Sequence, residues 1–167
     1  MPLGEALFSL RSIREGKPDP IPEADLRLML EAARCAGSAG NRQPWHFVVV
    51  TDPALKAKLR DYYHESWWAW YRSGIEGRAE HPHPPAHIKG AMRLTEELDR
   101  APVLILACAI GGLVVNEVLG ATQNLLLAAP ALGIGATLTR LTDLVIAFFG
   151  HEATKCPPND PCIRARC

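Results

Sequence analysis

VNEVLGATQNLLLAAPALGIG, residues 115–135, is the stretch that decides the fold. From about Val115 to Ala128 it is apolar on nearly every side, and Pro130 and Gly133 then close it. A surface helix would show a polar face, so this one requires burial in a core or against a partner subunit. We predict a buried helix that ends at Pro130, because a proline in a helix interior costs about 3 kcal/mol.

On either side of this helix, the chain alternates helical periodicity with short apolar runs. Residues 23–34 carry Leu26, Leu30 and Ala33 at helical spacing, with acidic residues in the first turn. Residues 45–51 and 101–109 are apolar runs typical of buried strands. Residues 54–71 and 88–100 predict two more helices, separated by a loop over 73–88. Helices around a few strands predict an α+β domain.

Length and composition limit the number of domains and the kinds of partner. With 167 residues and 48% hydrophobic content, we expect one domain over residues 1–150, followed by a divergent polar tail over 151–167 for which disorder is one interpretation. Eighteen basic residues balance eighteen acidic ones, which argues against nucleic acid and anionic membranes as partners. No apolar stretch suits a bilayer and no signal peptide is visible, so we expect a cytoplasmic location without a disulfide framework.

The first candidate binding segment is Arg11-Ser12-Ile13-Arg14. Two guanidinium groups and a hydroxyl within four residues can hold a phosphate, because arginine donates in a planar fork and stays charged. Solvated surface arginines are the alternative interpretation of the same pattern.

The second candidate is the turn at residues 37–45, GSAGNRQPW, between a helix and a strand. Glycine permits close backbone approach, Asn41 and Gln43 each offer a donor and an acceptor, and Pro44 stiffens the entry to the strand. Such groups suit the edge of a flat heterocycle such as an isoalloxazine or a nucleobase. A capped connection, in which Asn41 and Gln43 satisfy nearby backbone groups, remains the alternative.

Together these segments resemble the nitroreductase family in order and spacing. The matching parts are Arg11-Ser12-Ile13-Arg14, the connector at residues 17–22, the helix ending Glu31-Ala32-Ala33, the pattern Ser38-x-x-Asn41-x-Gln43-Pro44-Trp45-x-Phe47, and residues 123–129 with the glycine turn at 132–135. The resemblance covers roughly residues 7–51 and 101–140, and the combination is specific although each part alone is not.

The resemblance implies a fold and an activity. The fold would have a central, mainly antiparallel sheet flanked by helices, with the long core helix at a homodimer interface. FMN would lie between the subunits, take hydride from NADH or NADPH and pass electrons to nitroaromatics, quinones or similar small acceptors in a ping-pong sequence. Because the cofactor carries this chemistry, no catalytic side chain is expected.

The resemblance also implies roles for individual residues. The phosphate and ribityl end of FMN would be held by Arg11, Ser12 and Arg14. The flavin ring or ribityl chain would meet Asn41 and Gln43, which the Pro44-Trp45 turn fixes, and the backbone of Gly133 to Gly135 would approach the ring.

An aromatic cluster, Trp67, Trp68, Trp70 and Tyr71, lies between the two family-like parts of the chain. Aromatic faces stack on flat substrates, so these side chains are candidates for an acceptor pocket or lid. A core or dimer contact is the alternative interpretation.

Several features depart from the family pattern or suggest other functions. Gly16 replaces an aromatic residue, and the pattern fades after Arg140, so the alternative function is a non-catalytic or degenerate flavin-binding or dimerisation module. A group of histidines in the 73–88 loop and the cysteines of the tail could suggest a metal site; they are His81, His83, His87, Cys156, Cys162 and Cys167. The cysteine spacings match no common zinc ligand pair, and we expect no metal. The chain has neither a Walker lysine loop nor a G-x-G-x-x-G after a strand.

Overall fold

The computed structural model describes residues 1–73, 88–109, 115–141 and 144–152 of the chain. Its helices are α1 (Leu3–Ser9), α2 (Glu23–Arg34), α3 (Pro53–Ser73), α4 (Lys89–Glu97) and α5 (Val115–Ala131), with 3₁₀ turns η1 (Ala39–Asn41) and η4 (Leu98–Arg100). Its strands are β1 (Gly16–Lys17), β2 (Trp45–Val50), β3 (Val103–Ala109), β4 (Ile134–Leu141) and β5 (Leu144–Glu152).

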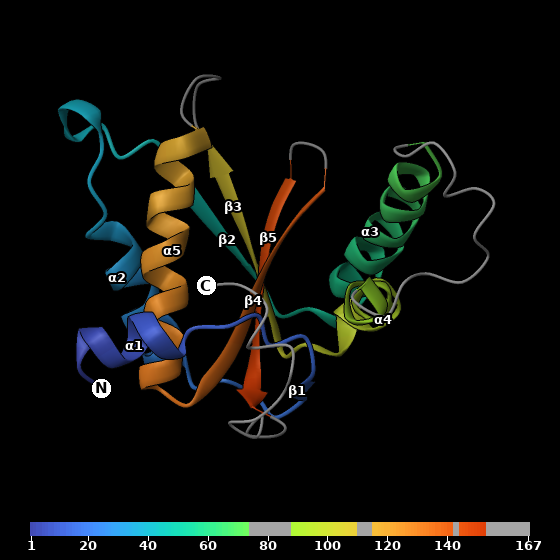
Figure 1. Ribbon diagram of the computed structural model, residues 1–167, viewed down its shortest axis with the longest axis horizontal. Helices are drawn as coiled ribbons and strands as arrows, with labels where there is room; N and C mark the ends of the chain where they lie inside the picture. The colour runs from blue at the N-terminus through green and yellow to red at the C-terminus, as the bar shows by residue number, and fades with distance from the viewer. Residues whose placement is uncertain (74–87, 110–114, 142–143, 153–167) are drawn as a thin grey trace.

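The strands form one antiparallel sheet in the order β1-β5-β3-β2, with β4 also paired to β5. Trp45 lies opposite Ala109 where β2 meets β3, and Ile105 lies opposite Ala147 where β3 meets β5. Helices cover both faces: α1, α2 and α5 lie on one side and α3 and α4 on the other (Figure 1). This arrangement confirms the predicted α+β class with a mainly antiparallel sheet.

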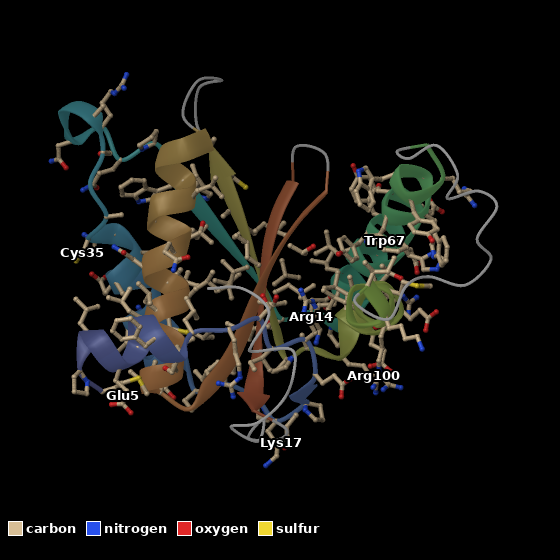
Figure 2. The ribbon with its side chains drawn as sticks, in the orientation of Figure 1. Glu5, Arg14, Lys17, Cys35, Trp67 and Arg100 are labelled. Atoms are coloured by element: carbon tan, nitrogen blue, oxygen red, sulfur yellow. The ribbon has the colours of Figure 1, made fainter. Side chains whose placement is uncertain are left out.

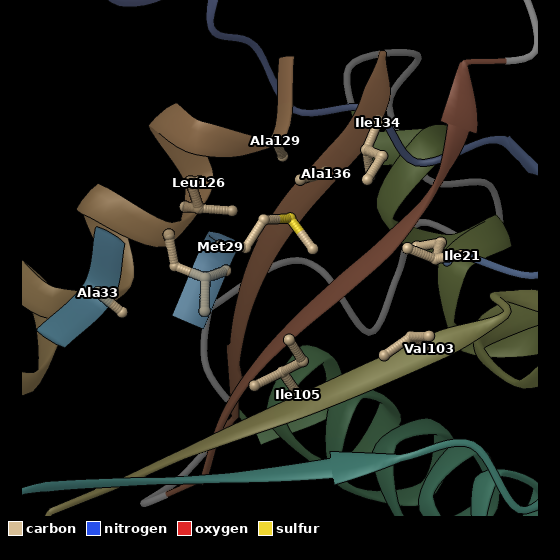
Figure 3. Packing of buried hydrophobic residues seen from close by; sticks show 10 residues of the cluster. Ile21, Met29, Ala33, Val103, Ile105, Leu126, Ala129, Ile134 and Ala136 are labelled. Atoms are coloured by element: carbon tan, nitrogen blue, oxygen red, sulfur yellow. The ribbon is translucent and has the colours of Figure 1, made fainter. Parts of the chain in front are cut away.

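The first core cluster fills the space between the sheet and the α2–α5 pair. Met29 of α2, Leu125 of α5 and Ile105 of β3 are fully buried in it, and Figure 3 shows side chains from α2, α5, β3 and β4 converging there. Asn124 of α5 adds a polar tie, because its Nδ2 donates a hydrogen bond of 3.3 Å to the carbonyl oxygen of Ala32. This packing confirms that α5 is a core helix.

The second core cluster lies on the opposite face, under α3 and α4. Leu104 of β3 packs there with Leu94, Leu98, Tyr63 and other residues of the two helices. Successive strand residues point to opposite faces, so Leu104 and Ile105 serve different clusters. Burial on both faces explains why β3 reads as a continuous apolar run instead of an alternating one.

The end of α5 corrects one prediction. We expected the helix to stop at Pro130, but it runs to Ala131 with Pro130 in its last turn. A proline there removes only one helical hydrogen bond near the end. The turn then closes with Leu132 N–H donating to the carbonyl of Ala129 and Gly133 N–H to that of Pro130, each at 3.0 Å.

The other predicted elements have mixed outcomes. The helix at 23–34 is confirmed, as are the strands at 45–51 and 101–109 and the helices at 54–71 and 88–100, with shifts at their ends. We did not predict α1, β1, β4 or β5, and β5 extends two residues past the expected boundary at 150. The predicted loop over 73–88 falls mainly outside the described residues.

No helix in the described part of the chain has the length and apolar character needed to span a membrane.

Candidate functional site

The Arg11-Ser12-Ile13-Arg14 segment runs along the edge of β4. The backbone turns extended at Leu10, where α1 ends, and Ile13 N–H then donates a 2.9 Å hydrogen bond to the carbonyl oxygen of Ala136. Arg11 is half-buried, and its Nη1 donates to the carbonyl oxygen of Ser9 at 3.4 Å. The Ile13 backbone bond therefore ties the segment to β4, and the Arg11 side-chain bond links it to the end of α1.

Two cavities meet at Arg11. The first, which we call the Arg11–Gln123 cavity, has a volume of 280 Å³, and Arg11, Ser12 and Gln123 supply polar groups to its wall. The second, the Arg11–Gly133 cavity, has a volume of 330 Å³ and is lined in part by Ser9, Arg11, Gly133 and Gly135. The structure thus brings together four of the predicted site residues, Arg11, Ser12, Gly133 and Gly135.

The glycine turn shapes the second of these cavities. Gly133 has φ of +70°, a conformation that favours glycine, and among the described residues other than its two chain neighbours no atom lies within 4 Å of the position that a Cβ would take. The Arg11–Gly133 cavity lies at the carboxyl end of α5, where unpaired carbonyls leave partial negative charge. That end suits the guanidinium of Arg11 better than a phosphate, so an anion fits the Arg11–Gln123 cavity better.

Arg14 lies apart from these cavities. It sits between the sheet and α4 (Figure 2), where its Cδ is 3.7 Å from the position that a Cβ on Gly90 would take. Its backbone neighbour Glu15 is paired with Arg93 of α4 at 2.6 Å. Within one chain, Arg11 therefore lies on the side of the sheet that α5 covers, and Arg14 lies on the side that α4 covers.

The Asn41–Pro44 turn lies at the other end of α5. In Figure 1, η1 projects beyond the amino end of α5, whereas α1 lies beside its carboxyl end. Asn41 and Gln43 have φ of 52° and 47° and are exposed. Gln43 donates its backbone N–H to Ser38 Oγ at 2.9 Å and its Nε2 to Asn41 Oδ1 at 3.2 Å, and Pro44 is buried. Some polar groups of the turn therefore bond to one another, while the side-chain amides of Asn41 and Gln43 remain at the surface.

The aromatic cluster divides between core and surface. Trp67 and Tyr71 are each 5% exposed and stack with a centroid distance of 5.2 Å in the second core cluster. Trp68 packs edge-on against both, and its Nε1 donates to His64 Nε2 at 3.1 Å. Trp70 is 54% exposed. Three of the four predicted pocket residues, Trp67, Trp68 and Tyr71, therefore contribute to packing.

Some polar groups near the site were not predicted from the sequence. Gln123 lies in the stretch that carries the family pattern, but its place on the cavity wall depends on how α5 faces residues 10–12. Ser9 Oγ and Thr137 Oγ1 are buried and have no hydrogen-bond partner within residues 1–73, 88–109, 115–141 and 144–152. No local sequence signal marks these two hydroxyls.

A third cavity, of 410 Å³, lies between α1, α2 and α5 and is mostly apolar. Large apolar side chains in its wall are exposed, with Leu3 at 68% and Met1 at 54%. Exposed apolar groups gathered at one place are typical of an interaction surface.

The structure does not test the predicted absence of a metal site, because the candidate metal ligands lie outside the described residues. Within the described ranges, no group of three His, Cys, Asp or Glu side chains could hold a metal. The histidines at 81, 83 and 87 and the cysteines at 156, 162 and 167 lie outside them.

Comparison with known proteins identifies relatives over most of the chain. Residues 9–148 match the family model described as "Nitroreductase family". A protein of Methanothermobacter thermautotrophicus, provisionally named NADH dehydrogenase/NAD(P)H nitroreductase, is 33% identical over 141 residues, which are 81% of this chain and 59% of that protein. A protein of Archaeoglobus fulgidus with the same provisional name is 31% identical over 78% of this chain and 62% of its own length. The chain therefore spans about 60% of the length of these relatives.

Solved structures share the fold. A structure of oxidized iodotyrosine deiodinase bound to FMN and 3-iodo-L-tyrosine has a TM-score of 0.74 and 24% identity, covering 99% of this chain and 100% of that one. A nitroreductase with bound FMN from Bacteroides fragilis has a TM-score of 0.64 and 19% identity, covering 96% and 97% of the two chains. At these identities the likeness shows the fold alone.

Proposed function

Because the chain belongs to the nitroreductase family, we propose that it is an FMN-dependent oxidoreductase that takes hydride from NADH or NADPH. Its acceptors would be nitroaromatics, quinones or similar small molecules, and the two half-reactions would alternate at one site. The provisional names of its relatives and the FMN in structures of the same fold support this proposal.

One observation carries the proposal: Arg11 lies in the wall of both adjoining cavities, with Ser12 and Gln123 in the first and Gly133 and Gly135 in the second. FMN has a charged phosphate, a polyol chain and a flat ring. Polar donors beside a glycine-lined space are the groups that such a ligand needs.

The donor set fits the cofactor. A guanidinium, a hydroxyl and an amide can all donate to phosphate or polyol oxygens, so Arg11, Ser12 and Gln123 would hold that end of FMN. The backbone at Gly133 and Gly135 has no side chain that would keep a ring away. When bound, FMN supplies the redox chemistry by accepting hydride from the nicotinamide and passing electrons to the acceptor. The protein contributes binding, orientation and electrostatics.

The proposal includes a homodimer, because one chain holds the predicted site residues at opposite ends of α5. This helix has 17 residues, which corresponds to about 25 Å at 1.5 Å per residue. Two copies packed antiparallel along α5 would bring the Asn41–Pro44 turn of one copy towards the Arg11 cavities of the other. The exposed apolar side chains around the third cavity support such a contact.

The aromatic cluster remains a proposed part of the acceptor site. Trp70 is the exposed member and Trp68 is half-buried, so these two are better placed than Trp67 and Tyr71 to meet a flat acceptor. Trp70→Ala should raise the KM for a quinone and leave the consumption of NADPH at saturating acceptor unchanged.

The absorption spectrum of the purified protein tests the proposal. FMN is added, unbound flavin is removed by desalting, and spectra are recorded before and after anaerobic addition of NADH or NADPH. Flavin bands that stay with the protein and bleach support the oxidoreductase. Bands that stay without bleaching favour the non-catalytic module, and bands lost on desalting contradict FMN binding.

A further inference from the structure

The last turn of α5 lacks one backbone hydrogen bond, because it contains a proline. Pro130 has no N–H, and the N–H at that position of a helix would donate to the carbonyl oxygen of Leu126, four residues earlier. The next N–H groups have other acceptors, since Leu132 donates to Ala129 and Gly133 to Pro130, each at 3.0 Å. The Leu126 carbonyl is therefore left without its helical donor.

No other donor takes the place of the missing N–H in the part of the chain that the structure describes. Within residues 1–73, 88–109, 115–141 and 144–152, neither a side chain nor a backbone N–H from outside α5 donates to the Leu126 carbonyl. Leu126 is only 6% exposed, so bulk water has little access to it. A carbonyl in such a place carries a free-energy cost that a hydrogen-bond donor would remove.

This carbonyl lies on the face of α5 where the two Arg11 cavities meet. Leu126 and Pro130 are four residues apart, so they share one face of the helix. Leu126 lines the Arg11–Gln123 cavity, and Pro130 lines the Arg11–Gly133 cavity. A proline ring also clashes with the carbonyl four residues earlier, which favours a tilt of the Leu126 carbonyl away from the helix axis.

The Leu126 carbonyl differs chemically from the other polar groups of the Arg11–Gln123 cavity. Arg11 can only donate hydrogen bonds, and Ser12 and Gln123 can donate as well as accept. These groups suit a phosphate, whose oxygens accept. A backbone carbonyl can only accept, so it disfavours phosphate and favours a hydroxyl or N–H group. Within FMN, the hydroxyls of the polyol chain are such donors.

We propose that Pro130 makes the Leu126 carbonyl a specificity-determining group, which accepts a hydrogen bond from the polyol chain of a bound flavin. This inference rests on the proposed FMN site. A flavin without the polyol chain would leave the carbonyl unpaired, so the site would prefer flavins that carry the chain. A residue with an N–H at position 130 would engage the carbonyl within the helix and abolish that preference.

The test compares two flavins that have the same ring and no phosphate. Riboflavin carries the polyol chain, and lumiflavin has a methyl group in its place. Fluorescence titration of the full chain gives both dissociation constants, and the ratio of lumiflavin to riboflavin constants measures the polyol preference. Pro130→Ala should lower this ratio about fivefold, the effect of one neutral hydrogen bond. The ratio of riboflavin to FMN constants should not change, because the phosphate donors are unaltered.

Two further variants separate the carbonyl from other effects of the substitution. Pro130→Val also restores the N–H but keeps apolar bulk in the cavity wall, so it should lower the polyol preference as much as Pro130→Ala does. Gly120→Ala is the matched control, because it too places a better helix former in α5, at an exposed position that lines neither cavity. It should keep the wild-type ratio.

Hydrogen exchange of the flavin-free variants tests the premise directly. In Pro130→Ala and Pro130→Val, the new amide at position 130 should exchange slowly, as expected when it donates to Leu126 within the helix. Fast exchange at this amide would overturn the inference, because the carbonyl would then not be available to it. Circular dichroism checks folding, and Pro130→Val decides the test if Pro130→Ala does not fold.

The binding outcomes separate the two proposals. A polyol preference that stays at the wild-type value in both Pro130 variants overturns the role of Leu126 and leaves the FMN site intact. A loss in Pro130→Ala alone also overturns it, because the proline ring would then be responsible, and so does an equal loss in Gly120→Ala. Wild-type protein that binds FMN but does not prefer riboflavin to lumiflavin contradicts this inference alone. Wild-type protein that binds neither FMN nor riboflavin contradicts the proposed FMN site as well.

Discussion

Lys56 of α3 donates a hydrogen bond of 2.7 Å from Nζ to the carbonyl oxygen of Ala101, the second residue before β3. Lys56 is only 8% exposed, and the two residues are 45 positions apart in the chain. Lysine can bury its long stem if its charged end finds partners. The bond therefore joins the first turn of α3 to the entry of a central strand.

Replacing Lys56 should destabilise the fold. Lys56→Ala should lower the free energy of unfolding by about 1–3 kcal/mol, because the Ala101 carbonyl loses a buried partner. Lys58→Ala is the matched control, since Lys58 is exposed on the same helix and should change stability by less than about 0.5 kcal/mol. Urea unfolding measures both, and equal stabilities would show that the bond contributes nothing.

Two glycines should respond to alanine with opposite signs. Gly120 lies exposed within α5 with open space around its Cβ position, so Gly120→Ala should raise stability by about 1 kcal/mol. Gly133 has φ of +70°, and Gly133→Ala should lower stability by about 1 kcal/mol because a Cβ strains that conformation. Thermal unfolding of the two variants tests this; shifts of the same sign would contradict the turn geometry.

Tyr63 should make stability fall at alkaline pH. Burial raises its pKa above the ordinary value of 10.0, so the folded state disfavours the charged phenolate. The contribution is fully present below the unfolded pKa and is lost as the pH rises through the folded pKa. The difference in unfolding free energy between wild type and Tyr63→Phe should therefore shrink from about pH 9 to about pH 11. A difference that stays constant over this range would contradict the burial of the phenol.

Local patterns predicted the elements whose partners are close or whose burial is obvious. Residues 23–34 show one apolar stripe, and α5 is apolar all round, so both were recognisable as helices. β5 depends on pairing with residues 16–17, 103–107 and 134–141, and no local pattern reports such distant partners. α1 buries only Ala6 and exposes Leu3, Leu7 and Phe8, so its sequence lacks the usual inward-facing stripe.

The site was predictable only in part, because local sequence patterns name residues but do not show how distant segments are brought together. The family pattern named Arg11, Ser12, Gly133 and Gly135, which the fold gathers around two cavities. It did not predict that Arg14 points to α4, because side-chain direction along an extended segment depends on what flanks it. Nor could spacing in the sequence show that Asn41 and Gln43 lie at the far end of α5, since that depends on how α2 packs against it.

Arg11 should contribute to flavin binding through its charge. Arg11→Ala should weaken FMN binding by about 1.5–3 kcal/mol, as expected for the loss of charge-assisted hydrogen bonds. Arg27→Ala is the control, because Arg27 is an exposed residue of α2 paired with Glu23. Fluorescence titration with FMN gives both constants. Equal affinities in the two variants would remove Arg11 from the phosphate site.

The apolar surface beside α1 should control both assembly and flavin retention. Leu3 is 68% exposed and lines the cavity between α1, α2 and α5, so Leu3→Asp would place a charge in the proposed dimer contact, where desolvation is costly. Light scattering should show a dimer for wild type and a monomer for this variant, which should also lose FMN on desalting because the partner's turn is absent. Leu55→Asp, on an exposed leucine of α3 away from this surface, should remain dimeric and keep FMN. A Leu3→Asp variant that stays dimeric would place the interface elsewhere, and one that is monomeric but retains FMN would show that a single chain completes the site.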